Sequence, residues 1–132
     1  MVLTRACAYG VFGVMYLAKQ PKGKIASLAE VAGAENIPEK FLAKIFQSLT
    51  RSGLIRSHRG ARGGFSLGRP TNQITVKELL EAIQGPLCYA KCLSEMEECE
   101  KTESCKLRTI LQEAQNVTMK TLTQNTLADL VP

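Results

Sequence analysis

The feature that most restricts the fold is a pair of short helical patterns followed at once by a basic, glycine-rich stretch. The first helix, "LAEVAGA" at 28–34, follows a capping-box pattern formed by Ser27 and Glu30. The second, "PEKFLAKIFQSLTR" at 38–51, begins with proline in its first turn and stops before Gly53, a residue typical of left-handed helix ends. Two short helices with a tight connection predict a helix-turn-helix.

The second helix of this pair has one apolar and one polar face. The apolar residues recur at helical spacing and predict an inward-facing surface: Leu42, Ile45, Phe46 and Leu49. The polar face either only keeps the helix in solution or reads base edges in a DNA major groove. The DNA interpretation assigns that face to Lys40, Lys44 and Gln47, with Pro38 and Phe41 at the start of the helix.

The next stretch, "GLIRSHRGARGGFSLGR" at 53–69, predicts two short strands around a basic tip. Beside a helix-turn-helix, such a hairpin is a wing, and its glycines let the backbone approach a phosphate or a narrow groove. The alternative is a phosphate-cradling nucleotide loop, but the Walker pattern is missing and no helix follows directly. We therefore predict DNA contacts from Arg59, Arg62 and Gly63.

The charges of the chain are unevenly divided. Residues 1–70 carry a net charge of +8 and residues 71–132 a net charge of −3. The basic half favours an anionic partner, here double-stranded DNA, although a lysine-rich solvated surface would have the same sign. With one histidine, His58, and one aspartate, Asp129, a catalytic triad is hard to build, and we expect no enzyme.

A first helix is expected over about 4–19, with Val11, Met15 and Ala18 on its apolar stripe and Phe12 beside it. Its charged start and apolar run resemble a signal peptide, but no small-residue cleavage site follows. No stretch reaches the roughly 18 apolar residues of a membrane span. We expect a cytoplasmic protein without a membrane partner.

The run "CLSEMEECEKTESC" places Cys92, Cys99 and Cys105 among five glutamates. An odd number of cysteines in a reducing cytosol indicates metal binding, reactivity or burial rather than disulfides. Thiolates are soft ligands for iron–sulfur clusters, zinc or copper(I), and structural zinc sites usually contain closer cysteine pairs. Reduced, unliganded thiols are the remaining alternative.

The C-terminal part predicts two further helices. The first, over 76–84, has a capping box from Thr75 and Glu78. The second is expected over about 104–127, and 24 helical residues would span roughly 36 Å, more than so small a domain needs. It either packs on its own domain or, as we favour, pairs two protomers through a mainly apolar seam: Leu107, Leu111, Ala114, Thr118 and Leu122.

Taken together, four blocks of the chain resemble the Rrf2 family of bacterial transcription regulators, which includes IscR-like, NsrR-like and RirA-like iron–sulfur sensors. The blocks are "LTRACAYGVFGVMYLA", the helix-turn-helix with its "RGARGGFSLGR" wing, "ITVKELLEAIQG" and the three late cysteines. The resemblance covers nearly the whole chain. It implies a winged-helix homodimer with crossing C-terminal helices, a near-palindromic operator and a two-iron or four-iron cluster near the dimer interface.

The family's three cluster cysteines correspond to Cys92, Cys99 and Cys105. The fourth ligand differs, because Arg108 stands where IscR-like members have histidine, and Ala8 where NsrR-like members have aspartate. Candidates for the fourth ligand are therefore Cys7 and Cys88. The remaining alternatives are a glutamate, a water molecule or a small thiol.

We therefore predict a mainly α protein with a small β-hairpin wing. A winged helix-turn-helix domain occupies 1–86, and a cluster-binding segment with a dimerisation helix occupies 87–132. The expected function is a regulator, such as a repressor, whose operator binding follows a cluster that senses iron, oxygen, nitric oxide or redox state. The alternative is a cluster-free winged-helix regulator controlled by a protein or small thiol partner, like the cysteine-metabolism repressors of the family.

Overall fold

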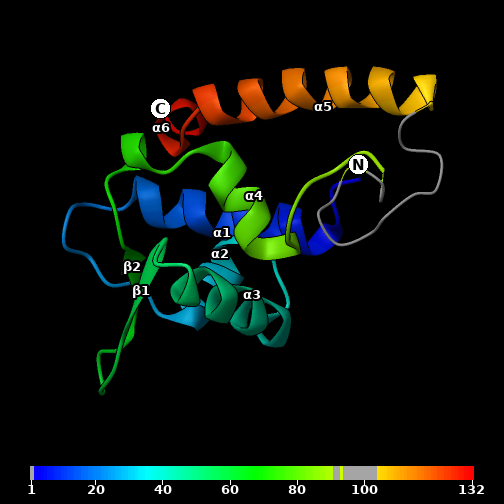
Figure 1. Cartoon of the computed structure of the whole chain (residues 1–132). Helices are drawn as coiled ribbons and strands as arrows, with labels where there is room; N and C mark the ends of the chain where they lie inside the picture. The colour runs from blue at the N-terminus through cyan, green and yellow to red at the C-terminus, as the bar shows by residue number, and fades with distance from the viewer. Residues whose placement is uncertain (1, 91–92, 94–103) are drawn as a thin grey trace.

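The structure, a computed structural model, describes residues 2–90, 93 and 104–132. Helices dominate, and one two-stranded antiparallel hairpin projects from them, so the predicted fold class is confirmed (Figure 1). In chain order the elements are α1 (Arg5–Lys19), α2 (Leu28–Glu35), α3 (Glu39–Arg51), β1 (Ile55–His58), β2 (Gly64–Leu67), the 3-10 turn η1 (Thr71–Gln73), α4 (Val76–Gln84), α5 (Lys106–Gln124) and α6 (Leu127–Leu130).

Helix α1 crosses the centre of the molecule. It begins where expected, because the Thr4 side chain caps the N–H of Cys7. Its most buried side lies one step around the helix from the predicted stripe: it consists of Cys7, Gly10, Gly13, Val14 and Leu17. The predicted stripe residues only pack at the edge of the core, and Phe12 is 48% exposed. The glycines explain the difference, since they let α3 and α4 approach α1 closely.

Helices α2 and α3 form the predicted helix-turn-helix. Asn36, in the left-handed conformation, ends α2, and Gly53 at φ +80° follows α3. The predicted inward face of α3 is confirmed, because its four apolar residues are all buried. Only half of the predicted capping box forms at α2. The Ser27 side chain accepts the N–H of Glu30, but the Glu30 carboxylate turns to other partners.

The hairpin pairs Ile55 with Leu67 and His58 with Gly64, so its first strand begins one residue later than expected. Its second strand is held to the domain by a bridge between Ala26 and Phe65, and the Phe65 ring meets the buried Phe46 ring edge-on at 4.9 Å. The tip extends well beyond the helices (Figure 1). Anchored strands with a projecting tip are the arrangement that a wing requires.

Helix α4 begins at the predicted Thr75–Glu78 capping box. Helix α5 is shorter than expected and ends at Gln124 instead of 127, so its 19 residues span about 28 Å. The reason is tertiary: Thr126 forms a bridge with Thr75, and Leu127 is fully buried in the main core as the start of α6.

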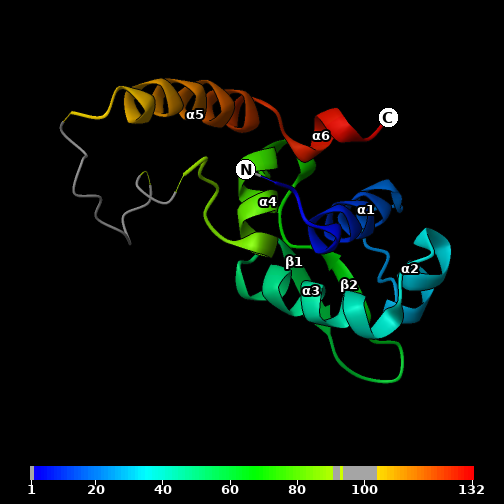
Figure 2. The ribbon, with the colours of Figure 1, turned by 90° about the vertical axis from the view of Figure 1, so that its right-hand side faces the viewer.

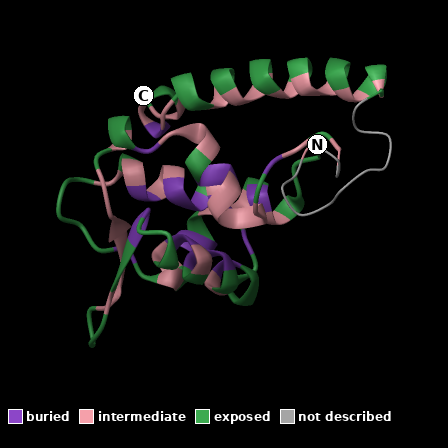
Figure 3. Cartoon of the chain, in the orientation of Figure 1, coloured by how far each residue is buried: buried purple, intermediate pink, exposed green. Residues whose placement is uncertain are grey.

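Helix α5 lies across α4 on the side of the molecule opposite the hairpin (Figures 1 and 2). Two of its residues, Met119 and Leu122, pack on a small apolar cluster of Cys7, Leu80 and Leu87. The remote side of α5 is exposed, whereas the side toward the domain is half-buried (Figure 3). Within residues 2–90, 93 and 104–132, none of the helices combines the length and hydropathy that a membrane crossing requires.

Candidate DNA interface and cluster-binding segment

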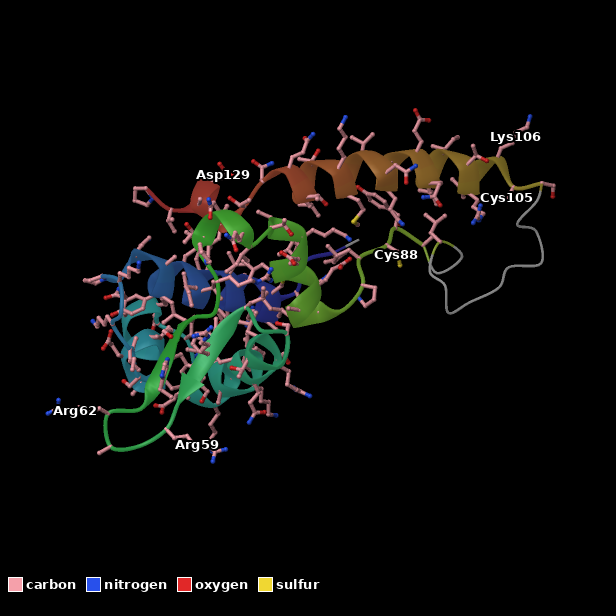
Figure 4. All side chains as sticks on the ribbon, turned by 60° about the vertical axis from the view of Figure 1, so that its left-hand side comes forward. Arg59, Arg62, Cys88, Cys105, Lys106 and Asp129 are labelled. Atoms are coloured by element: carbon pink, nitrogen blue, oxygen red, sulfur yellow. The ribbon has the colours of Figure 1, made fainter. Side chains whose placement is uncertain are left out.

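Every sequence-predicted DNA contact on α3 is exposed. Lys40, Lys44 and Gln47 project from the side opposite the buried face, and Pro38 occupies the N-cap of the helix. Arg59 and Arg62 lie at the tip of the hairpin (Figure 4). The helix and the tip therefore offer their polar groups on the same part of the molecule, away from α5.

Phe41 has a different position from its neighbours on α3. Its ring meets the Tyr9 ring of α1 edge-on, with 5.7 Å between the ring centroids, and it remains 44% exposed. It therefore orients the first turn of α3 against α1. The rest of the side chain faces solvent.

A groove of about 520 Å³ separates α3 from the hairpin. Gln47 lines it together with three polar residues that the sequence interpretation missed: Thr50, Arg51 and Ser57. Arg51 follows Gln47 by four residues and so extends the same polar face, a signal that helical spacing contains. The position of Ser57 depends on the packing of the hairpin against α3, which local sequence does not specify.

The tip of the hairpin depends on Gly63. Its N–H donates to the carbonyl of Gly60 at 3.0 Å. A β-carbon at position 63 would lie 2.5 Å from the carbonyl oxygen of His58, which is too close for any side chain. The glycine therefore shapes the tip that carries Arg59 and Arg62.

Two of the three predicted cluster ligands, Cys92 and Cys99, lie outside the described residues. The third, Cys105, is the N-cap residue of α5, and its sulfur accepts the N–H of Arg108 at 3.4 Å. Among the described residues, no three His, Cys, Asp or Glu side chains form a group that could hold a metal ion.

The two candidates for a fourth ligand have contrasting surroundings. Cys7 is 1% exposed within the apolar cluster beneath α5, and burial raises the pKa of its thiol. Cys88 is only partly buried. Its neighbour Tyr89 is tied to α5, since its N–H donates to Gln115 and its hydroxyl pairs with Thr118 at 2.8 Å.

Cys105 offers one thiol sulfur and a nearby backbone N–H donor. Thiolates are the usual ligands of iron–sulfur clusters, and N–H donors to sulfur adjust their reduction potential. The Arg108 Nε atom is buried and has no hydrogen-bond partner in the described part of the chain. Buried donors normally have acceptors, and the sulfur atoms of a cluster are acceptors of this kind.

A helix-turn-helix with a basic hairpin wing defines a winged-helix DNA-binding protein. More specifically, the chain belongs to the Rrf2 family: residues 3–132 match the family model described as "iron-dependent transcriptional regulator". Proteins of this family are transcription regulators that bind DNA.

Solved structures of regulators have the same fold. CymR (YrzC), the global cysteine regulator of B. subtilis, is 26% identical with a TM-score of 0.79, covering 98% of this chain and 95% of that one. A putative transcriptional regulator from Listeria innocua is 28% identical with a TM-score of 0.79, covering 98% and 85%. T. potens IscR, at 23% identity, a TM-score of 0.77 and coverage of 98% and 85%, supports the fold alone.

Proposed function

We propose that this regulator binds a near-palindromic operator with an affinity set by an iron–sulfur cluster. Lys40, Lys44 and Gln47 read base edges in the major groove, where lysine and glutamine form hydrogen bonds. Arg59 and Arg62 grip phosphates or enter the minor groove beside it. The exposure of all five side chains supports this assignment.

The cluster is held by Cys92, Cys99 and Cys105. When bound, it supplies a group that oxygen, nitric oxide or iron shortage can alter. The observation that carries the proposal is the position of Cys105 at the N-cap of α5, where the Arg108 N–H and the positive helix end favour an anionic ligand atom. As a fourth ligand, the partly exposed Cys88 is better placed than the deeply buried Cys7.

Helix α5 provides a route from the cluster to DNA. Its N-terminus begins at a proposed ligand, and its C-terminal half packs on Cys7 of α1 and Leu80 of α4. Helix α1 in turn contacts α3 through the Tyr9–Phe41 ring pair. A change at the first turn of α5 is therefore transmitted to α3, the helix proposed to read the bases, through packed elements. Coupling free energies between two such sites are typically about 1–3 kcal/mol.

The homodimer is part of the same proposal. The predicted seam divides between two sides of α5: Thr118 and Leu122 face the chain's own domain, whereas Leu107 is 61% exposed. The exposed apolar side, which we call the outer face, consists of Leu107, Ile110, Ala114, Val117 and Thr121. Two copies joined there by two-fold symmetry would space their reading helices by about 34 Å or a multiple of it.

The test is anaerobic purification with iron and sulfide analysis and visible absorption. Wild-type protein should be brown, with an iron-to-sulfide ratio that identifies a two-iron or four-iron cluster. Changing Cys92, Cys99 or Cys105 to alanine should remove the iron and leave the far-ultraviolet dichroism intact. Cys88→Ala should destabilise the cluster, with Cys7→Ala as its matched comparison. Full iron content in Cys99→Ala would contradict the ligand assignment.

A second candidate is a cluster-free regulator controlled by a protein or small thiol partner. It is favoured by the similarity to CymR, described as a global cysteine regulator. The two candidates differ in colour: the cluster-free regulator would be colourless and iron-free after anaerobic purification, yet fully able to bind its operator.

A further inference from the structure

A hollow of about 670 Å³ lies on the side of the hairpin turned away from α3. Its walls are the end of α1, the connection over 20–25 and the side of the hairpin that carries Arg56 and Ser66. This connection is the blue loop that follows α1 on the left of Figure 1. A volume of this size is typical of small-molecule sites. None of the residues assigned above to DNA or the cluster lines it.

The lining is cationic and contains no acidic side chain. Two of its four Lys and Arg residues are already paired: Lys24 with Glu30 at 3.0 Å and Arg69 with Glu78 at 3.3 Å. Lys22 and Arg56 form no ion pair within the part of the chain that the structure describes. These two cations are therefore available to an anion in the hollow.

Hydrogen bonds and ion pairs join the walls of the hollow before any ligand binds. Lys24 also bonds the Gln20 side chain, whose amide donates to the Tyr16 carbonyl, so the connection is fixed to the end of α1. On the hairpin, His58 Nε2 and Ser66 Oγ are 2.8 Å apart, which places both on the same face as Arg56. A preformed site loses less free energy on binding than one that must be ordered.

The lining of the hollow also contains four apolar residues: Leu17, Ala18, Ile25 and Leu67. A DNA phosphate gains no free energy from contact with apolar side chains, whereas a ligand with a hydrocarbon or aromatic body would cover them and gain from their burial. The carbonyl end of α1 disfavours negative charge. The anionic group therefore belongs between Arg56 of the hairpin and Lys22 of the connection, and the apolar body near Leu17.

We propose that this hollow binds a small organic anion, whose carboxylate or phosphate ester faces Arg56 and Lys22 and whose apolar body covers Leu17 and Leu67. The site is independent of the cluster. Because the hairpin forms one of its walls, the ligand would brace the wing against α1.

The experiment uses the full chain labelled with nitrogen-15 and follows the amides of Ile25, Ser66 and Gly68 in the hollow. Phenyl phosphate and hexanoate should give saturable shifts there. Inorganic phosphate and acetate, which carry the charge alone, should bind at least tenfold more weakly, and phenol should give no saturable shift. An equal response to inorganic phosphate and phenyl phosphate would overturn the proposal, as would shifts confined to other amides.

Two double variants separate the site from general charge effects. Lys22→Gln with Arg56→Gln should weaken phenyl phosphate binding at least tenfold. Lys77→Gln with Lys120→Gln removes the same charge outside the hollow and should leave binding unchanged. If phenyl phosphate does not bind wild-type protein, yet the first double variant loses DNA affinity, the hollow holds a DNA phosphate and the proposal is wrong.

Discussion

The Tyr16 hydroxyl donates a 2.6 Å hydrogen bond to the Glu30 carboxylate and thereby joins α1 to α2. Lys24 approaches the same carboxylate at 3.0 Å. The hydrogen bond from Tyr16, together with Lys24, lowers the pKa of the Glu30 carboxyl. The same hydrogen bond raises the pKa of the Tyr16 hydroxyl. Glu30 therefore links the helix-turn-helix to α1 rather than completing a cap on its own helix.

This link predicts a specific acid sensitivity. Because the folded-state pKa of Glu30 lies below its ordinary value of 4.5, its stabilisation is complete above that value and is lost as pH falls through the folded pKa. Glu30→Gln should lower the thermal midpoint at neutral pH and flatten its fall in acid. Glu113→Gln, on the exposed side of α5, is the control. Parallel acid profiles for both variants would show that the link contributes nothing.

Two glycine substitutions should have opposite effects. A β-carbon at Gly13 would lie 2.9 Å from the buried Phe46 ring, whereas at Gly33 it would meet nothing within 4 Å. Overpacking typically costs about 1–3 kcal/mol, more than the gain of up to about 1 kcal/mol from helix propensity. Gly13→Ala should therefore lower the free energy of unfolding and Gly33→Ala should raise it by about 0.5–1 kcal/mol. Denaturant titration measures both, and a stabilised Gly13→Ala would refute the close α1–α3 approach.

At the tip of the wing, Arg59→Ala should weaken operator binding. If one phosphate contact is lost, the slope of log affinity against log salt should flatten by about one unit. Fluorescence anisotropy at several salt concentrations measures both quantities. Lys77→Gln, which removes a charge from α4, should change neither. An unaltered slope in Arg59→Ala would exclude this arginine from the phosphate contacts.

The outer face of α5 predicts where dimerisation can be broken. Ile110 and Val117 are 63% and 61% exposed, and a glutamate at either position would bury a charge between two protomers. Ile110→Glu and Val117→Glu should sediment as monomers with unchanged helix content. Asn116→Glu adds the same charge to a different exposed side and should remain dimeric.

The opposite side of α5 supplies a comparison. Leu122 packs on the cluster of Cys7, Leu80 and Leu87 within its own chain. Because Leu122 is half-buried, Leu122→Ala should lower the stability of each protomer by about 1–2 kcal/mol, with no need for a partner. If this variant instead became a fully stable monomer, the side of α5 with Leu122 would be the dimer interface, and our assignment of the two sides would be wrong.

The sequence alone determined the elements whose signals are local. The caps Thr4, Ser27 and Thr75 each bond to backbone three residues away, and Gly53 meets a left-handed turn, so neighbouring residues suffice to place these helix ends. The same holds for the buried face of α3, since its spacing follows from the helix period alone.

The tertiary structure decided which of several compatible faces and partners is used. Helix α5 has enough apolar residues for two sides, and only its docking on Cys7 and Leu80 selects the side that is covered. Its end at Gln124 depends on Thr75, about fifty residues earlier. The bridge from Thr75 to Thr126 and the burial of Leu127 stabilise the chain more than a further turn of helix would. Such contacts join residues far apart in the chain, and no local pattern contains them.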